Sequence, residues 1–469
     1  MDAKKLLYDD VMTKEWTLNP GEEFRFEVGF KNSIEVKLKS GHAEYFGAEL
    51  GPEATYTFSG QNGAIFTWQG CTLSVTGDCQ SIYVAGETPM DSYINVHMAL
   101  QQLRVQAHSE MQSSAAKGTS AAPRVMIVGP EDSGKTSLAR ILINYAVRMG
   151  DRPIFVDLDP AEASVTVPGT ISATAIAKTI DIETGFMGYS TSSSVGGPSD
   201  SPLVLQFGHE LPSKNAVLFK LLVDRLTQAI AARFEADTFA AASGLIVDTR
   251  GFTDINKFDI IESAIASLGI NTLLVVGNER MYSLFSSRFS KADGSSGSVP
   301  VNVVKLAKSG GTVDRDAMYR QQLSAHRIRQ YFYGTPSEPV MSFSTVVNFQ
   351  EISILRVGED VQAPSSTLPL GETRKLSETS VFAVEPDESL THSVLAVTEV
   401  NIGNGEEDGS DQKAIEEARK GVVGVQAVGF INVTKVDMEK KRFIAYSPVP
   451  GRLPKQVLLY GHIKWMETL

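Results

Sequence analysis

The stretch of chain from residue 124 to residue 160 constrains the fold more than any other part of the sequence. Residues 129–136 read GPEDSGKT and fit the pattern G-x-x-x-x-G-K-[ST] of a phosphate-binding loop. A short apolar run, residues 125–128, precedes the loop, as expected of a buried parallel strand. Apolar residues then recur at helical spacing, at Leu138, Ile141, Leu142, Tyr145, Ala146 and Met149. A second apolar run at residues 153–158 completes a strand–loop–helix–strand unit, which predicts the start of a doubly wound sheet.

The residues of this loop have the chemistry that a nucleotide phosphate requires. Its glycines let successive backbone N–H groups face phosphate oxygens at the positive end of the following helix. Lys135 supplies a charge for the β- and γ-phosphates, and the hydroxyl of Thr136 can hold Mg²⁺. An ordinary glycine-containing turn is the alternative, but the motif and both of its flanks are present together, which favours the nucleotide site.

Composition limits the remaining possibilities. With 469 residues the chain is too long for one core, so we expect two or three domains. The net charge of −12 argues against a passive nucleic-acid coat, although a local basic groove remains compatible with it. Only Cys71 and Cys79 are present, which favours a reducing compartment. The histidines lack metal-ligand spacing and no apolar run reaches membrane-spanning length, so we expect neither a zinc site nor a membrane contact.

The first part of the chain, residues 1–105, is predicted to be a β domain. Four segments carry alternating or β-rich patterns: residues 23–28, 34–39, 64–68 and 81–84. They favour a small β-sandwich of half-buried strands. A helical pattern begins at Asp91, and residues 106–122, which become rich in Ser, Ala and Gly, are expected to be a linker.

Residues 123–335 alternate predicted strands with predicted helices. This order implies a mainly parallel, doubly wound sheet covered on both faces. Apolar alternation returns in residues 336–469, for which we expect a small C-terminal α+β domain. The chain as a whole is therefore predicted to be an α/β protein, in which a central phosphate-loop domain is flanked by a β-sandwich-like domain and a small C-terminal domain.

Acidic residues follow two predicted strands of the central domain. Asp157 and Asp159 end the second strand, and strand ends of this kind face the ligand crevice. Carboxylates there can hold Mg²⁺ or take a proton from an attacking hydroxyl, whereas the alternative is an Asp-Pro turn cap. Asp159 is the better candidate because it lies nearest the crevice. Asp248 is either a metal-side carboxylate or a turn residue, and the sequence does not separate the two.

Residues 308–333 form the most basic segment of this acidic chain. Arg315 and Arg320 are five positions apart, so on one helix they diverge, and each could contact a different side of a transferred phosphate. A solvated helix face is the alternative. The presence of the phosphate loop favours a lid over the nucleotide.

Ten short motifs carry a resemblance over nearly the whole chain: GEEFRFEV (21–28), GHAEYFGAEL (41–50), FTWQGC (66–71), YVAGETPM (83–90), GPEDSGKTS, NYAVRMG, VDLDP, VPGTISA (167–173), KSGG (308–311) and RIRQYFYG (327–334). Together they resemble the polynucleotide 5′-hydroxyl kinase family of pre-mRNA 3′-end cleavage factors. The similarity is closest to the kinase-like subunits of fungal cleavage factor IA.

This resemblance implies three domains, bound ATP with Mg²⁺, and a nuclear location. It also implies a scaffold subunit of cleavage factor IA and other cleavage and polyadenylation subunits as partners, with mostly indirect contact to RNA. Glu23 matches a position that contacts adenine, and Asn62 stands where relatives carry a lysine beside the base. The implied phosphate-binding residues are Gly129, Asp132, Ser133, Gly134, Lys135, Thr136 and Ser137, with Thr136 and Asp159 at the metal. In a working kinase Asp159 would be the catalytic carboxylate, and Arg315 and Arg320 would be the lid arginines.

The sequence departs from active relatives on the acceptor side. Those relatives follow the catalytic Asp with a variable residue and then Gly-Gln, whereas this chain has Ala161 and Glu162 at the last two positions. Ala161 adds a Cβ where backbone approaches closely, and Glu162 adds a negative charge near phosphates. Residues 209–211 and Phe252 stand where active relatives grip the end of the RNA with polar residues and a tryptophan.

Two functions of different classes therefore stay open. One is an ATP-bound, catalytically inactive subunit required for endonucleolytic cleavage in mRNA 3′-end formation. The other is an active RNA 5′-hydroxyl kinase that uses ATP and Mg²⁺. A GTP-driven switch is disfavoured because residues 277–280, GNER, contain no Asn-Lys-x-Asp guanine reader.

Overall fold

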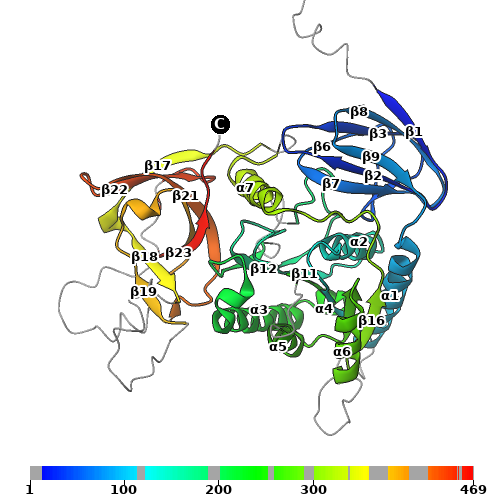
Figure 1. Ribbon diagram of the computed structural model, residues 1–469. Helices are drawn as coiled ribbons and strands as arrows, with labels where there is room; N and C mark the ends of the chain where they lie inside the picture. Colours follow the sequence, from blue (N-terminus) through cyan, green and yellow to red (C-terminus); the bar gives the residue numbers. More distant parts are fainter. Residues whose placement is uncertain are drawn as a thin grey trace, which may run out of the picture.

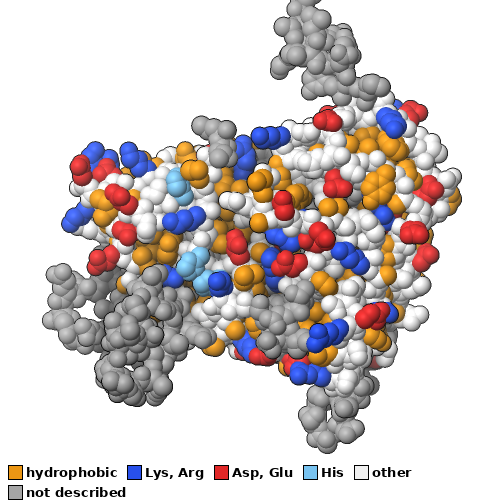
Figure 2. Space-filling view, viewed as in Figure 1, with side chains coloured by type: hydrophobic (Ala, Val, Ile, Leu, Met, Phe, Trp, Pro, Cys, Tyr) orange, Lys and Arg blue, Asp and Glu red, His pale blue; other side chains and the backbone are white. Residues whose placement is uncertain are grey.

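The chain folds into three units arranged around a central sheet (Figure 1). The structure, a computed structural model, describes residues 13–112, 122–187, 201–251, 258–289, 300–335, 339–358, 379–400, 421–451, 453 and 457–467. Among these residues no helix is long and apolar enough to cross a membrane. Acidic and basic side chains are intermixed over the centre of the face in Figure 2.

The N-terminal unit consists of two packed sheets. One has the order β1 (Lys14–Leu18), β8 (Cys71–Gly77), β3 (Ile34–Gly41) and β6 (Thr55–Phe58). The other has the order β5 (Ala48–Glu49), β4 (Glu44–Tyr45), β7 (Gln61–Phe66), β2 (Glu23–Val28) and β9 (Ser81–Ala85). Their inner apolar faces, which include Phe24, Phe26 and Phe58, form one core. The β-sandwich expected from the alternating pattern is therefore present.

Strand β2 differs from the half-buried strand that its alternation predicts. The charged side chains of Glu23 and Arg25 are 4% and 6% exposed, so both faces of this strand are covered. The polar face packs against the central unit, where a Cβ on Gly311 would lie 2.7 Å from Arg25 Nε. In the sequence, a polar strand face that packs against another unit has the same alternating pattern as a face exposed to solvent. The pattern therefore predicted an exposed face for β2.

The central unit is built on a seven-stranded sheet. Its order is β13 (Leu203–Gln206), β12 (Thr170–Ala175), β11 (Ile154–Leu158), β14 (Leu245–Thr249), β10 (Arg124–Val128), β15 (Thr272–Val276) and β16 (Asn302–Leu306). Strands β11, β14, β10, β15 and β16 are parallel to one another, and β12 and β13 join antiparallel at the β11 edge. The sheet is thus mainly parallel, as predicted.

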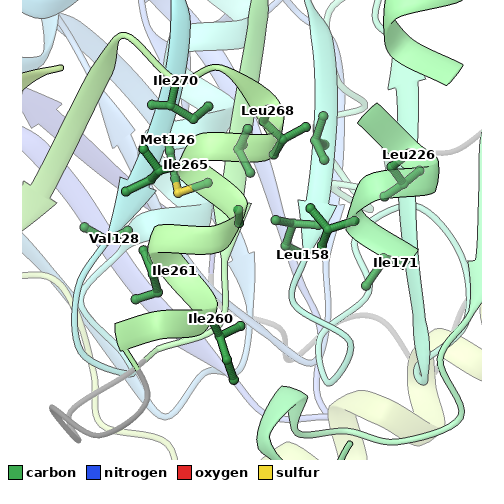
Figure 3. Close-up of a cluster of buried hydrophobic side chains, with 14 of the residues drawn as sticks. Met126, Val128, Leu158, Ile171, Leu226, Ile260, Ile261, Ile265, Leu268 and Ile270 are labelled. Atoms are coloured by element: carbon green, nitrogen blue, oxygen red, sulfur yellow. The ribbon is translucent and has the colours of Figure 1, made fainter. Parts of the chain in front are cut away.

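Helices cover both faces of this sheet. Helices α1 (Met90–Gln112) and α2 (Lys135–Arg148) share one apolar core with it. Helices α3 (Ala216–Ala236), α5 (Phe258–Leu268) and α6 (Glu279–Phe289) share the opposite core, part of which Figure 3 shows, and the short α4 (Thr238–Ser243) follows α3. Apolar side chains at helical spacing on each helix face these cores, which is why the sheet is doubly wound.

Helix α1 extends further than the sequence indicates. It continues to Gln112, so residues 106–112 of the predicted linker are helical instead. Arg104, which is fully buried, donates from Nε to the carbonyl of Ser243 at 3.1 Å, and Ala107 packs against Ala242. These contacts with α4 hold the end of α1 in a helix despite its polar composition.

The C-terminal unit is a second seven-stranded sheet. Its order is β17 (Phe343–Asn348), β22 (Arg442–Ser447), β21 (Ala427–Asp437), β20 (Ser393–Thr398), β23 (Val457–Lys464), β18 (Ser353–Val357) and β19 (Val381–Ala383). Its helical layer is α7 (Ala317–Tyr333), whose Phe332 stacks on Trp465 at a centroid distance of 5.7 Å. Because α7 also reaches the central unit, it links the C-terminal sheet to the site described below.

Candidate functional site

A cavity of about 220 Å³ lies between the N-terminal unit, the phosphate loop and α7. Strands β2 and β7, residues 131–137 and residues 309–313 contribute to its lining. After β10 the chain continues to β11, which lies on one side of β10 in the sheet, whereas β15 lies on the other side. The cavity therefore lies at the strand ends where the order reverses, which is the usual ligand position in such sheets.

The phosphate loop has the strained, open backbone that its sequence predicts. Asp132 and Gly134 have φ angles of 54° and 85°, in the left-handed region. A Cβ on Gly129 would lie 2.6 Å from the carbonyl oxygen of Val276, so only glycine fits there. The loop leads directly into α2, whose N-terminal N–H groups face the cavity side of the loop.

The side chains of the loop are held within the site. Lys135 Nζ donates to the carbonyl of Pro130 at 2.6 Å, and burial lowers the pKa of this lysine. Ser133 Oγ donates to the same carbonyl at 2.9 Å, and Ser137 lines the cavity. The ammonium group is therefore buried beside the loop, where a phosphate would provide the negative charge that it lacks.

Thr136 and Asp248 are brought together at the end of β14. Thr136 Oγ1 donates to Asp248 Oδ2 at 2.6 Å, and burial raises the pKa of Asp248 to about 7. Asp248 Oδ1 also accepts the backbone N–H of Thr249 at 2.9 Å, so this carboxylate has both the contact of a turn residue and the hydroxyl contact expected at a metal site. The sequence did not predict the pairing, and it placed Asp159 at the metal with Thr136.

The oxygen atoms of Thr136, Asp248 and Asp159 suit Mg²⁺ rather than a softer metal. Among the described residues no group of three or more His, Cys, Asp or Glu side chains is arranged to enclose a metal ion. Mg²⁺ tolerates such a sparse set because it keeps several waters and shares phosphate oxygens. The residues present therefore fit a nucleotide-bound Mg²⁺.

Asp157 and Asp159 have separate roles. Asp157 accepts hydrogen bonds from the backbone N–H groups of Asp159 at 3.0 Å and Ser164 at 2.6 Å. Asp157 thus fixes the turn after β11 and acts as a turn cap, which is the alternative that the sequence offered. Asp159 lines the cavity, with its Oδ1 at 3.4 Å from Arg250 Nη1, and the same oxygen accepts the backbone N–H of Ala161 at 3.0 Å, so Asp159 also caps the turn. Burial and the nearby charge of Glu162 raise the pKa of Asp159.

Arg315 and Arg320 converge, contrary to the expectation that they diverge on one helix. Arg315 Nε and Arg320 Nη2 donate to the two carboxylate oxygens of Asp132 at 2.7 Å and 2.5 Å. They converge because α7 begins only at Ala317, so Arg315 lies in the extended segment before it. Arg315 also donates from Nη2 to Glu162.

Two cationic partners in this region were missed from the sequence. Arg250 follows β14 and bridges Asp159 and Glu131, with a 3.0 Å contact from Nη2 to Glu131 Oε1. Arg25 donates from Nε to Glu23 Oε2 at 2.8 Å. Arg25 lies within the motif GEEFRFEV without a role assigned to it, and no motif marks Arg250. The available signal for each was a basic residue two positions after an acidic candidate.

Glu23 and Asn62 lie on neighbouring strands and both line the cavity. The carboxylate of Glu23 accepts from Arg25 and from Thr88 Oγ1, which fixes its orientation. Met90 and Tyr93 of α1 line the same part of the cavity. The N-terminal unit thus provides a wall with polar and apolar groups beside the phosphate loop.

His209, one of the proposed RNA-gripping positions, lies elsewhere. The ring of His209 stacks on His462 at a centroid distance of 4.6 Å, at the contact with the C-terminal unit. His209 is not among the residues that line the phosphate-loop cavity. Phe252 lies outside the described residues.

Three family descriptions match successive parts of the chain. Residues 17–107 match "N-terminal beta-sandwich domain of polyadenylation factor" and residues 129–334 match "mRNA cleavage and polyadenylation factor CLP1 P-loop". Residues 341–467 match "Pre-mRNA cleavage complex II protein Clp1". The chain belongs to the Clp1 family of mRNA cleavage and polyadenylation factors. The family resemblance inferred from the sequence motifs is thus confirmed.

Relatives match this Clp1-family chain along almost its full length. The mRNA cleavage and polyadenylation factor clp1 of Botryotinia fuckeliana is 39% identical over 453 residues, which cover 96% of this chain and 93% of the relative. The CLP1 homolog of Nematostella vectensis is 35% identical and covers 97% of each chain.

Two solved structures share the fold. One is a wild-type Clp1p–Pcf11p complex, with a TM-score of 0.80 and 25% identity over 98% of this chain and 99% of its own. The other has the same TM-score and identity, and concerns an extended Pcf11p–Clp1p interface and ATP loss in a glycine-to-arginine point mutant. The predicted α/β architecture with flanking units is therefore confirmed.

Proposed function

We propose that this Clp1-family protein keeps ATP and Mg²⁺ as resident ligands and acts in mRNA 3′-end formation as a structural subunit without RNA kinase activity. Lys135 and the backbone of residues 132–137 would bind the phosphates. Thr136 with Asp248, and Asp159 from the same end of the neighbouring parallel strand β11, would hold Mg²⁺ together with phosphate oxygens. A P-loop relative that loses ATP in a point mutant supports ATP as the nucleotide.

The contact between Glu162 and Arg315 is the observation on which the proposed lack of phosphoryl transfer rests. Burial acts to raise the pKa of Glu162, but Arg315 outweighs this effect and the pKa is lowered, so the carboxylate is charged. A phosphoryl-transfer site needs its arginines free to stabilise charge that develops in the transition state. Here the lid arginine is held by a carboxylate at the position where active relatives have a neutral amide.

The same cavity would select adenine through the N-terminal unit. Glu23 can accept a hydrogen bond from the adenine amino group, while guanine offers a carbonyl at that position. Asn62 lines the cavity from the neighbouring strand β7, where it pairs with Glu27 and not with Glu23. A nucleotide bound between this wall and the phosphate loop would join two units and become part of the folded structure.

The proposed partners are a scaffold subunit of the cleavage factor and other cleavage and polyadenylation subunits. The proposed location of the protein is the nucleus. The support is the complex of a Clp1p relative with Pcf11p over a matching fold. Contact with RNA would be mostly indirect.

An active RNA 5′-hydroxyl kinase is the second candidate function. Asp159 favours it, because this carboxylate lies in the cavity and its pKa is raised by burial, as a general base requires. Radiolabel transfer from γ-labelled ATP to a short 5′-hydroxyl oligoribonucleotide tests both candidates. We expect no labelled RNA. Label transfer that disappears in the Asp159→Ala variant would replace the structural function with the kinase.

A further inference from the structure

Two arginines in the cavity wall have no acidic partner. Arg140 lies on α2, one turn after Thr136, and Arg327 lies on α7. Both line the same cavity as the phosphate loop. The other cavity arginines, Arg250 and Arg315, form ion pairs, whereas neither Arg140 nor Arg327 forms one within the described residues.

The backbone of residues 184–185 holds these two arginines side by side. Arg327 Nη1 donates to the carbonyl of Thr184 at 3.1 Å. The next residue, Gly185, lies against the guanidinium of Arg140, where a Cβ would be only 2.6 Å from Nη1. Arg140 Nε is buried and has no hydrogen-bond partner among the described residues. The arginine pair is therefore fixed in place and its hydrogen-bonding capacity is not filled.

The electrostatic environment of the pair is unfavourable without a ligand. Burial, together with the charge of Arg140, lowers the pKa of Arg327 to about 10. Burial also lowers the pKa of Arg140. Glu162 is the carboxylate that acts on both, but it already binds Arg315. Burying two positive charges next to each other is unfavourable unless a negative charge compensates them. We therefore expect a bound anion beside this arginine pair.

Two phenol groups border the same region. Tyr45 and Tyr319 both interact electrostatically with Arg327, and Tyr45 also interacts with Arg140. Within the described part of the chain, the hydroxyls of Tyr45 and Tyr319 have only long contacts, of 3.4 Å to Gln61 and 3.5 Å to Gly60. Tyr319 lines the cavity and Tyr45 does not, so the donor set offered to a tetrahedral oxyanion consists of the two guanidinium groups and the Tyr319 hydroxyl.

We propose that Arg140 and Arg327 form a second anion subsite, separate from the phosphate loop, which binds a phosphate group brought by another ligand. It adds to the proposed nucleotide site and shares only the cavity with it. The phosphate is either free or part of an RNA strand, since both present the same oxygens to the arginines. The nucleotide itself is not the source, because its phosphates are already served by the loop and Lys135.

The test uses the full chain saturated with ATP and Mg²⁺, titrated with inorganic phosphate or with a short 5′-phosphorylated oligoribonucleotide at constant ionic strength. Thermal unfolding reports binding. We expect saturable stabilisation of the wild type and at least tenfold weaker binding of the anion in Arg140→Gln and Arg327→Gln. Arg329→Gln, an exposed arginine on the same helix, is the control and should bind as the wild type does. The probe that stabilises identifies the source.

Two results separate this subsite from a merely structural role. Without phosphate, Arg140→Gln should be at least as stable as the wild type, because an uncompensated charge is removed, whereas a structural arginine would destabilise when removed. Affinity for ATP should change less than threefold. If neither probe stabilises the ATP-loaded wild type, or if Arg140→Gln loses ATP together with the anion, the subsite does not exist as proposed.

Should the glutamine variants fail to fold, Arg140→Lys and Arg327→Lys keep the charge. Repeating the titration on Lys135→Ala protein tests the subsite even if the nucleotide assignment fails.

Discussion

The carboxylate of Glu162 and the guanidinium of Arg315 form an ion pair between the loop after β11 and the segment before α7. Arg315 is shared with Asp132 of the phosphate loop, so one arginine binds two acidic groups around the cavity. A terminal phosphate of a bound nucleotide would compete with these carboxylates for the same arginine.

We therefore predict that Glu162→Gln raises the affinity for ATP relative to ADP by about tenfold, equivalent to about 1.4 kcal/mol. The substitution removes a negative charge near the terminal phosphate and frees Arg315 to bind that phosphate. Calorimetric titration of both nucleotides measures the ratio. Glu210→Gln, at an exposed position, is the control. An unchanged or lower ATP preference in Glu162→Gln would contradict the competition.

The double variant Lys135→Ala with Thr136→Ala should not retain nucleotide. It removes the buried ammonium group and the hydroxyl that binds Asp248. A ligand that binds only the folded state stabilises it by about 2.7 kcal/mol at one hundred times its dissociation constant, and the variant should lack this gain. The matched control is Lys305→Ala with Thr238→Ala, both at exposed positions. Nucleotide extracted at the wild-type level from the first variant would refute the site.

Substitution Glu23→Gln should reduce the preference for ATP over GTP. The amide lacks the charge that strengthens a hydrogen bond from the adenine amino group, and such bonds contribute about 1.5–3 kcal/mol. We expect a loss of about tenfold or more in selectivity, measured by competition of ATP with GTP. Glu27→Gln on the same strand should leave selectivity as it is. Equal selectivity of Glu23→Gln and the wild type would remove Glu23 from the base site.

Phosphate chemistry was predictable from the sequence because the loop is contiguous. Residues 129–136 have the backbone angles and the buried lysine that the motif requires. By contrast, Thr136 and Asp248 are 112 positions apart, and only the parallel pairing of β10 with β14 brings them within 2.6 Å. A candidate carboxylate could be named, but its partner could not be deduced from spacing.

Contacts between units account for the other differences. The charged face of β2 resembles a solvent face in sequence, yet Arg25 lies against Gly311 of the central unit. The end of α1 resembles a linker, yet Arg104 bonds the carbonyl of Ser243. Local patterns record which side chains alternate, but they do not record whether water or another unit covers the polar face. Arg250, Arg140 and Arg327 were missed for the same reason.

Stability should fall in mild acid because of His97, which is buried against the ring of Tyr145. Burial lowers the pKa of His97 to about 4, below its ordinary value near 6.5, so the unfolded chain binds more protons between these pH values. The full free energy of unfolding is therefore available above about pH 6.5, where His97 is neutral in both states. It decreases as the pH falls toward 4, by up to about 3 kcal/mol at roughly 1.4 kcal/mol per pH unit.

Substitution His97→Phe should therefore reduce the shift of the urea midpoint between pH 7 and pH 5. His42→Phe, at an exposed histidine, is the control and should keep the wild-type shift. If His97→Phe and the wild type lose stability in parallel, His97 is not the group that takes up the proton.

The resident-nucleotide account is tested most directly by extracting the nucleotide from the purified full chain. The protein is incubated with Mg²⁺ and excess 5′-hydroxyl oligoribonucleotide, quenched in acid, and its nucleotide is identified and counted by chromatography. The account predicts about one ATP per chain, unchanged by the RNA. Conversion of the bound ATP to ADP in step with phosphorylation of the RNA would contradict it.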